Sequence, residues 1–440
     1  MTSSFSLRRH STRWGLLFLI GLLPLLVGCS DESLLEPEST DARFDRYVAL
    51  GNSITAGFQS DGINQSLQQQ SYAVRLADQM NTPFSIPALN DPGCPPPLTQ
   101  IFPPERAAPI ECALRESPTP TRINNMAVPG AWVQDALTND ASEGANPNAL
   151  TSFILGGRTQ VEAATELRPT FATVWLGNND VLRAALAGDP AISTDPSTFS
   201  SRYTAVLDSL EAAGADAGAL AGVADVTLIP NLSPGAAYFA ADQSGQLPPS
   251  FDVANNCAPS GQGGVGDQMR VPFRYGIGVF LQLASTGQNV ELDCTDNRPL
   301  IEIFDEPTLE QIGAADIASN SLLTVSETQT LGARTQAYNS FLQQQANDRG
   351  WAYVNVNTAL GALYAAGTDT PTDPSDDLVP KFPNLAPEQP TFGAFFSEDG
   401  VHPSSATHQV VTNLFVDAIN AEYNTSLEPI EAPDVPAPPQ

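Results

Sequence analysis

The stretch Tyr47-Val48-Ala49-Leu50-Gly51-Asn52-Ser53-Ile54-Thr55-Ala56-Gly57-Phe58 carries a short apolar run into a glycine and then a serine. The run has the length and composition of a buried β-strand, and Gly51 is a residue at which such a strand would end. Ser53 would then lie just past the carboxyl end of a strand, which is where open α/β sheets bind ligands. We interpret Ser53 as a nucleophile, although glycine, asparagine and serine also favour turns without any catalytic role.

Three later stretches place polar residues or glycine in comparable positions. They are Asn125-Met126-Ala127-Val128-Pro129-Gly130, Trp175-Leu176-Gly177-Asn178-Asn179-Asp180 and Glu398-Asp399-Gly400-Val401-His402-Pro403. The last one places the carboxylate of Asp399 three residues before His402. Together with Ser53, this supplies the constituents of a Ser/His/Asp triad.

These four blocks resemble those of the SGNH, or GDSL-type, hydrolases, a family named after a serine, a glycine, an asparagine and a histidine in this order. The matching residues here are Ser53, Gly130, Asn179 and His402. The resemblance covers about residues 47–423. One departure concerns Asn52, because the first block of the family usually reads Gly-Asp-Ser-Leu. Asn52 leaves the triad intact, since the family's acid lies beside the histidine, and the departure bears only on the hydrogen bonding of the serine turn, which the sequence leaves open.

The resemblance implies a catalytic mechanism without a cofactor. Ser53 attacks the ester, His402 takes its proton and returns it to the leaving alkoxide, and Asp399 holds the imidazole. The backbone N–H groups of Ser53 and Gly130 and the side-chain amide of Asn179 form the oxyanion hole. Asn178 and Asp180 are expected to be structural residues of the Asn179 loop.

The expected substrates are small carboxylic esters, in particular lipid or acyl esters. The segment Asn231-Leu232-Ser233-Pro234-Gly235 resembles the Asn-Leu-Pro-Pro-x-Gly segment of the plant-type, lipolytic branch of the family. A carbohydrate O-acetylesterase of the same fold is the alternative within the class. A catalytically inactive binding lipoprotein is the alternative from another class, and Asn52 is the reason to consider it.

The fold class expected is α/β, a flavodoxin-like three-layer α/β/α sandwich around a central parallel sheet of five strands, with long loop insertions. Strands are predicted near residues 46–51, 122–127, 171–176, 224–230 and 351–356, and helices near 71–80, 158–167, 198–218 and 330–349. Because Ser53 and His402 must meet, residues 45–425 form one catalytic domain.

Long connections interrupt this domain near residues 86–120, 236–310 and 367–398. The run Val271–Leu281 forms either a lid or acyl-binding wall or the core of its insertion. Phe395 and Phe396 line either the substrate pocket or a core. The acidic stretch 369–377 has no ligand spacing for calcium, so no metal site is predicted.

The amino terminus reads as a bacterial lipoprotein signal. Arg8, Arg9 and Arg13 precede an apolar run over residues 14–27, which is shorter than the roughly 20 residues that span a bilayer. Leu26-Val27-Gly28-Cys29 resembles a lipobox. We therefore expect a signal peptide over residues 1–28, lipidation of Cys29, an acidic tether over 29–44 and export to the cell envelope. Ser30 favours the outer membrane. Residues 426–440 form a proline-rich tail.

Four cysteines remain beyond Cys29, and an even number in an exported chain predicts disulfides. Of the three connectivities, the simplest pairs neighbours, Cys94 with Cys112 and Cys257 with Cys294. Beyond the signal peptide, the chain holds two histidines. His408 falls inside a helical pattern over residues 404–423, whereas His402 precedes it.

The charge is strongly unbalanced, with 49 acidic and 19 basic residues for a net charge of −30. This excludes a typical nucleic-acid partner, because phosphate contacts require lysine and arginine. Membrane contact is expected through the lipid anchor, and the sequence does not specify an oligomeric state. The acidic excess predicts a halophilic protein. A GC-rich genome is the alternative; it explains why Lys381 is the one lysine, but not the acidic excess.

Overall fold

The computed structural model describes residues 39–109, 122–138, 149–312, 314, 318–366, 379–384 and 390–436. The expected signal peptide, Cys29, most of the tether, Cys112 and the acidic stretch 369–377 lie outside these residues. Among the residues described, no helix is both long enough and apolar enough to cross a membrane.

A parallel sheet forms the centre of the fold, and in the described part of the chain it has four strands. Their order is β1 (Tyr47–Gly51), β4 (Phe171–Trp175), β5 (Ala217–Ala221) and β10 (Ala352–Val354). Ala49 pairs with Thr173, and Thr173 pairs with Ala219. Every residue of β1, β4 and β5 is buried, as expected for apolar strands that are covered on both faces.

The prediction of five strands is wrong in two places. The segment near 122–127 makes a single parallel bridge, between Asn125 and Ala49, beside β1. Backbone bonds still follow β1 here, because the Ala49 N–H donates to the Asn124 carbonyl and the Met126 N–H donates to the Ala49 carbonyl. The Asn125 side chain accepts from the Ala127 N–H and donates to the Thr55 carbonyl.

The strand predicted near 224–230 is also misplaced. Val226–Leu228 forms a 3₁₀ turn capped by Asp225, and the strand is β5, seven residues earlier. Its sequence, Ala-Gly-Ala-Leu-Ala, is small because a Cβ at Gly218 would lie 2.4 Å from the Trp351 ring. The preceding helix, predicted to reach 218, ends at Ala213, where Gly214 has φ +115°.

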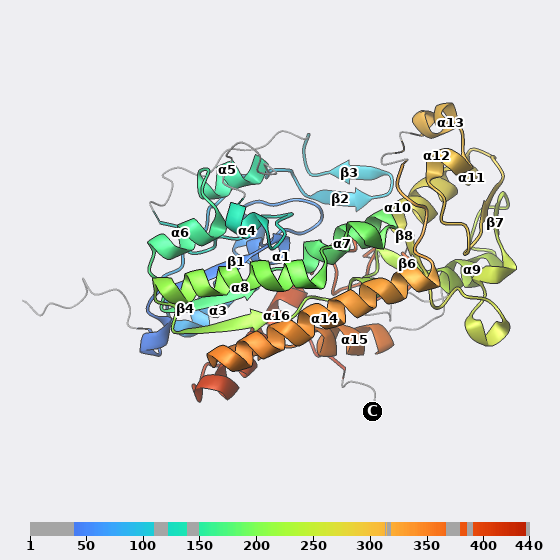
Figure 1. Ribbon diagram of the computed structural model, residues 1–440. Coiled ribbons are helices and arrows are strands. Elements are labelled where there is room, and N and C mark those ends of the chain that lie inside the picture. Colours follow the sequence, from blue (N-terminus) through green and yellow to red (C-terminus); the bar gives the residue numbers. More distant parts are fainter. Residues whose placement is uncertain are drawn as a thin grey trace, which may run out of the picture. The chain divides into compact units, whose positions relative to one another are not determined.

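Helices cover both faces of the sheet (Figure 1). One face packs against α3 (Tyr72–Met80) and α16 (Ser405–Tyr423), through residues such as Tyr47 and Ala221. The other packs against α6 (Gln160–Glu166), α8 (Pro196–Ala213) and α14 (Val325–Arg349), through residues such as Val48 and Leu220. The three-layer α/β/α sandwich is therefore confirmed. The remaining elements of the sandwich are α1 (Ser53–Ala56), α2 (Gln65–Gln68), α4 (Asp135–Thr138), α5 (Ala149–Leu155), α7 (Asn178–Ala187) and α15 (Val356–Ala366).

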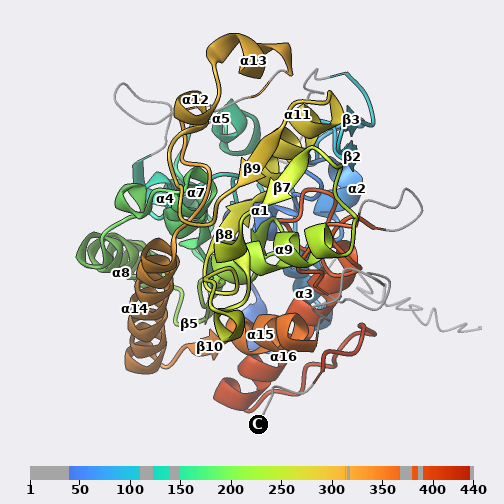
Figure 2. The ribbon, with the colours of Figure 1, turned by 90° about the vertical axis from the view of Figure 1, so that its right-hand side faces the viewer.

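The insertion after β5 has a core of its own, and its elements group at one end of the view in Figure 1 and face the viewer in Figure 2. These elements are β6 (Leu232–Pro234), α9 (Gly235–Gln243), β7 (Phe251–Val253), β8 (Arg270–Pro272), α10 (Phe273–Tyr275), a π-helix (Gly276–Leu281), α11 (Gln282–Ser285), β9 (Val290–Leu292), α12 (Leu300–Ile303) and α13 (Glu306–Gln311). Earlier in the chain, β2 (Leu98–Ile101) and β3 (Pro104–Arg106) pair as an antiparallel hairpin.

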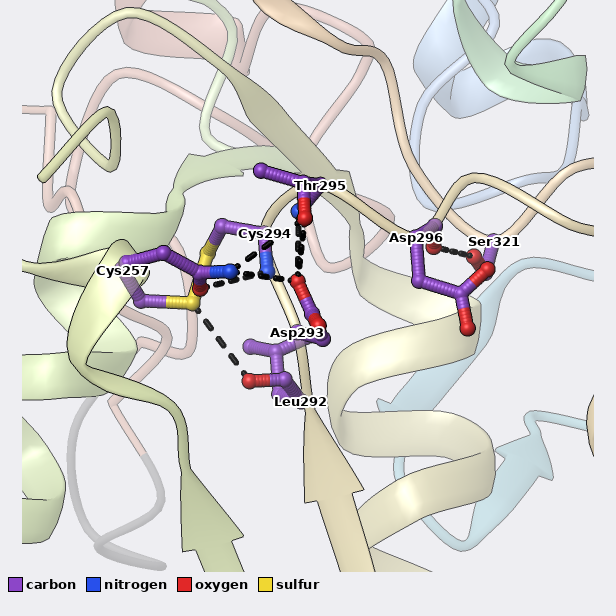
Figure 3. The surroundings of a disulfide bond; sticks show 8 residues. Cys257, Leu292, Asp293, Cys294, Thr295, Asp296 and Ser321 are labelled. Carbon is purple, nitrogen blue, oxygen red and sulfur yellow. Dashed lines mark hydrogen bonds between the residues drawn. A yellow bond between two sulfur atoms is a disulfide. The ribbon is translucent and has the colours of Figure 1, made fainter.

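A disulfide joins Cys257 to Cys294 within this insertion, as the pairing of neighbours predicts (Figure 3). The Cys294 N–H donates to the side chain of Asn256, so the second half-cystine is also held through its backbone. Cys94 is disulfide-bonded as well. Its predicted partner, Cys112, lies outside the described residues.

Candidate active site

Ser53 is the first residue of α1 and follows β1 after one residue. That intervening residue, Asn52, caps the helix, because its side-chain oxygen accepts from the Ile54 N–H at 3.1 Å. Gly57, with φ +82°, ends the helix. Asparagine thus does the capping that an aspartate does equally well. Its Nδ2 atom is buried and has no hydrogen-bond partner among the described residues.

Asp399 and His402 form a closed pair on the loop before α16. His402 Nδ1 lies 2.7 Å from Asp399 Oδ2. The other carboxylate oxygen accepts from the N–H groups of Val401 and His402, at 2.8 Å each. Gly400 has φ +68°, which lets the chain turn back so tightly. The predicted acid and base are therefore within hydrogen-bond distance of each other.

The surroundings set the charge of this pair. Burial by itself would raise the pKa of Asp399, but the His402 imidazole and the hydrogen bonds to the carboxylate lower it to about 2. Burial would lower the pKa of His402, but the Asp399 carboxylate outweighs it and raises that pKa above its ordinary value. Asp399 is thus ionised near neutral pH. A neutral His402 keeps its proton on Nδ1, which leaves Nε2 as the acceptor.

The other histidine does not belong to the site. His408 lies in α16, where it is buried and its Nδ1 accepts from the Tyr72 N–H at 3.2 Å. Burial lowers the pKa of His408 to about 3, so the ring stays neutral. It anchors the start of α3 to α16, which agrees with the prediction of a helix residue.

The turn after α1 joins the serine segment to the acid loop. The Asp61 N–H donates to Asp399 Oδ2 at 2.6 Å, and the Ser60 N–H donates to Ser397 Oγ at 2.8 Å. The Phe58 and His402 rings lie 4.9 Å apart. Ser60 and Asp61 have φ of +53° and +50°, a conformation that costs energy outside glycine. Sequence reasoning missed this turn, because its conformation depends on partners more than 330 residues away.

The predicted oxyanion-hole residues lie on two adjoining loops. Gly130 has φ +82°, and the next residue, Ala131, accepts from Asn179 Nδ2 at 2.9 Å. An amide nitrogen carries two hydrogens, so a second N–H of Asn179 is left for a substrate. The structure thus brings Asn179 to the loop of Gly130.

The two neighbours of Asn179 hold these loops together. Asn178 accepts from the Ala224 N–H at 2.9 Å. Asp180 accepts from the Val133 N–H at 3.1 Å and from Thr194 Oγ1 at 2.7 Å, so it ties the Gly130 loop to α7. Burial raises the pKa of Asp180 to about 6. Both residues are structural, as the sequence suggests.

Phe395 and Phe396 line a small pocket of about 90 Å³, and so do Ile54, Val401 and Pro403. Ile54 follows the serine, and the other two flank His402. The walls are almost wholly apolar and come largely from α15 and α16. The two phenylalanines therefore lie beside the site as well as in a packed layer.

Two larger pockets adjoin each other near Asn179. The first, of about 480 Å³, is lined in part by residues of α7, among them Asn179 and Arg183. The second, of about 610 Å³, lies between the β2–β3 hairpin and the insertion. Leu186 and Arg274 line both. Nothing in the sequence indicated that Arg183 and the β2–β3 hairpin line pockets near the site. The aromatic run Val271–Leu281 was the one sequence feature that pointed to the larger pocket.

The run Val271–Leu281 lies in the core of the insertion and also lines one of these pockets. Val271, Tyr275 and Ile277 are fully buried in the insertion core. Phe273 and Val279 line the larger pocket. In the described ranges, no cluster of three or more His, Cys, Asp or Glu side chains is arranged to hold a metal ion.

Comparison with known proteins gives the following matches. The family model for GDSL-like lipases and acylhydrolases matches residues 47–262. Similar solved structures include an acetylxylan esterase from Geobacillus stearothermophilus, which is 10% identical over 85% of this chain and 94% of its own, with a TM-score of 0.33. An alpha/beta hydrolase from the metagenome of Lake Arreo, Spain, is 12% identical over 88% and 99%, with a TM-score of 0.35. No curated protein matches the chain in sequence.

Proposed function

The chain belongs to the family of GDSL-like lipases and acylhydrolases and is a serine ester hydrolase, and from this premise we propose that it cleaves lipid or acyl esters through an acyl-Ser53 intermediate. The observation that carries the proposal is the Asp399–His402 pair. A buried, ionised carboxylate 2.7 Å from Nδ1 fixes the imidazole so that Nε2 is free to act as a base.

In the proposed mechanism, Ser53 attacks the ester carbonyl while His402 Nε2 takes its proton. The same proton then passes to the leaving alkoxide, and water repeats the sequence in reverse to release the acid. Asp399 stabilises the imidazolium throughout. The N–H groups of Ser53 and Gly130 and the free amide hydrogen of Asn179 stabilise the oxyanion, each contributing about 3 kcal/mol to lowering the barrier.

An apolar acyl group is supported by the lining of the pocket beside Ser53 and by the Asn231-Leu232-Ser233-Pro234-Gly235 segment. The small volume of the Phe395–Phe396 pocket, about 90 Å³, favours a second candidate, an O-acetylesterase that acts on a carbohydrate. The two candidates differ in the length of the acyl chain that they accept.

We also propose that the protein is exported and held at the cell envelope, at the outer membrane, by lipid on Cys29. The support is the lipobox-like Leu26-Val27-Gly28-Cys29 and the serine that follows it. Labelling of growing cells with an alkyne fatty acid tests this. The full-length protein should take up label and sediment with outer membranes, whereas C29A should do neither. Equal labelling of C29A would contradict the anchor.

Hydrolysis of p-nitrophenyl esters from acetate to palmitate, by a soluble form that starts after Cys29, tests the activity. Ser53-dependent turnover is expected, with an optimum longer than acetate for a lipid esterase and at acetate for an O-acetylesterase. A fluorophosphonate probe should label the wild type and leave S53A unlabelled. Folded wild-type protein that neither reacts with the probe nor cleaves any ester would favour the binding lipoprotein.

A further inference from the structure

The pocket of about 610 Å³ is built mainly by parts that do not belong to the sandwich. Ile101 and Phe102 come from the β2–β3 hairpin, and Phe273, Gly278 and Val279 come from the insertion after β5. Its volume falls within the roughly 300–1,000 Å³ of sites for small molecules. Ten of its fourteen lining residues are apolar or glycine, as in a site for an apolar ligand.

This pocket is joined to the active site from two sides. On one side, Leu186 and Arg274 also line the pocket that contains Asn179, the proposed oxyanion donor. On the other side, the Ile101 N–H donates to the Glu398 carboxylate at 3.1 Å, next to Asp399. The pocket is therefore connected to the segments that carry Asn179 and Asp399.

Asn231 makes the closest connection. It lines the pocket, and its Nδ2 donates to the Asp399 carbonyl at 2.8 Å. Its N–H donates to the Gly400 carbonyl at 3.0 Å, and its own carbonyl accepts from the Phe273 N–H at 2.7 Å. One residue thus fixes the wall of the pocket to the turn that carries the catalytic acid.

We propose that this pocket binds a long, unbranched hydrocarbon chain of the ester substrate, so that the two insertions set the chain-length preference. The inference rests on the proposed ester hydrolysis. It names long-chain lipid esters as the substrate class and decides against the second candidate, acetylated carbohydrates. Burial of one methylene contributes about 0.8 kcal/mol, which corresponds to roughly a fourfold rise in kcat/KM per carbon while the pocket fills.

Gly278 offers a way to fill the pocket without disturbing its wall. A Cβ at this position would meet its nearest neighbours, the Arg274 Cβ and the Phe273 carbonyl, at 3.7 Å, which is ordinary contact. A phenylalanine there would extend into the cavity. Gly332 in α14 is the matched control, because a Cβ there meets no atom within 4 Å and the residue lies outside the pocket.

The experiment compares wild type, G278F and G332F on p-nitrophenyl acetate and decanoate. The ratio of kcat/KM for decanoate to that for acetate should fall at least 30-fold in G278F and stay within threefold in G332F. V279A, which shortens a side chain of the same wall and so enlarges the pocket, serves if G278F does not fold, and it should change the decanoate-to-acetate ratio by more than threefold. Unchanged ratios in folded variants with Ser53-dependent activity would overturn the inference and leave the ester hydrolysis standing.

Binding gives a readout that does not need turnover. S53A should bind a fluorescent 16-carbon fatty acid, and S53A/G278F should bind it at least tenfold more weakly than S53A/G332F. If no ester is hydrolysed, the proposed function fails while this comparison still tests the pocket. Equal affinity of the two double variants, or no binding to S53A, would overturn the inference.

Discussion

At the scale of single residues, Asn52 shows how the serine turn tolerates a departure from the family pattern. Its side-chain oxygen caps α1, and its buried Nδ2 has no partner among the described residues. N52D keeps the acceptor, so we expect kcat/KM within about threefold of wild type. N52A loses the cap and should lower the free energy of unfolding by about 1 kcal/mol.

Urea unfolding and ester kinetics on the two variants check this. A gain of activity in N52D over an inactive wild type would instead favour the binding lipoprotein, since aspartate would then restore a lost function. N52A as stable as wild type would show that the capping bond contributes nothing.

The charge of Asp61 should raise the pKa of the catalytic base, His402. His402 acts when neutral, and its pKa is raised by the Asp399 carboxylate and, more weakly, by Asp61. The rate should therefore rise with pH through a midpoint above 6.5, the ordinary value for histidine. D61N removes one negative charge, so the His402 pKa should fall and the midpoint of the pH–rate profile should move to lower pH.

Arg106 provides the opposite variant, because its guanidinium pairs with the Asp61 carboxylate. R106Q removes the positive charge that balances the Asp61 carboxylate. The His402 pKa should therefore rise, and the midpoint of the pH–rate profile should move to higher pH. The pH dependence of kcat/KM from pH 5 to 9 measures both. Shifts of the same sign in D61N and R106Q would contradict this electrostatic account.

At the scale of elements, the apolar runs predict β1, β4 and β10 to within about two residues, because β1 and β4 are buried throughout and both end residues of β10 are buried. β5 lies outside its predicted range because Ala-Gly-Ala-Leu-Ala has no β-branched residue, and its Gly218 packs so closely on Trp351 that no larger residue fits there. The pairing of Asp399 with His402 followed from spacing along one loop. The support from Asp61 and Asn231 could not be predicted, since it comes from segments far apart in sequence.

The Cys257–Cys294 disulfide should stabilise the insertion after β5 more than the rest of the fold. It closes a loop of 37 residues, for which chain entropy predicts a stabilisation of about 4 kcal/mol. We expect C257A/C294A to melt at a lower temperature and to lose decanoate hydrolysis before acetate hydrolysis on heating, because the insertion forms the wall of the larger pocket. Thermal inactivation with both esters measures this, and parallel loss of the two activities would show that the insertion does not unfold separately.

At the scale of the whole molecule, the net charge of −30 opposes folding through self-repulsion. Most of the ion pairs among the described residues, such as Arg158–Glu166 and Arg298–Asp296, lie at the surface, where water and salt weaken the attraction between the charges. They cannot offset an excess of 30 negative charges. Added salt can offset this repulsion, because the screening length of electrostatic interactions falls from about 10 Å at 0.1 M to about 3 Å at 1 M.

Raising NaCl from 0.1 to 2 M should therefore raise the melting temperature, with most of the gain below 1 M, where screening changes most. Sucrose is the control, because it stabilises by exclusion from the surface without screening charge. At pH 5 the same addition of NaCl should raise the melting temperature less, since carboxylates begin to take up protons and their mutual repulsion is already smaller. A melting temperature that does not depend on salt at pH 7 would mean that the acidic composition carries no adaptation to salt, and the GC-rich genome would remain as the account of the single lysine.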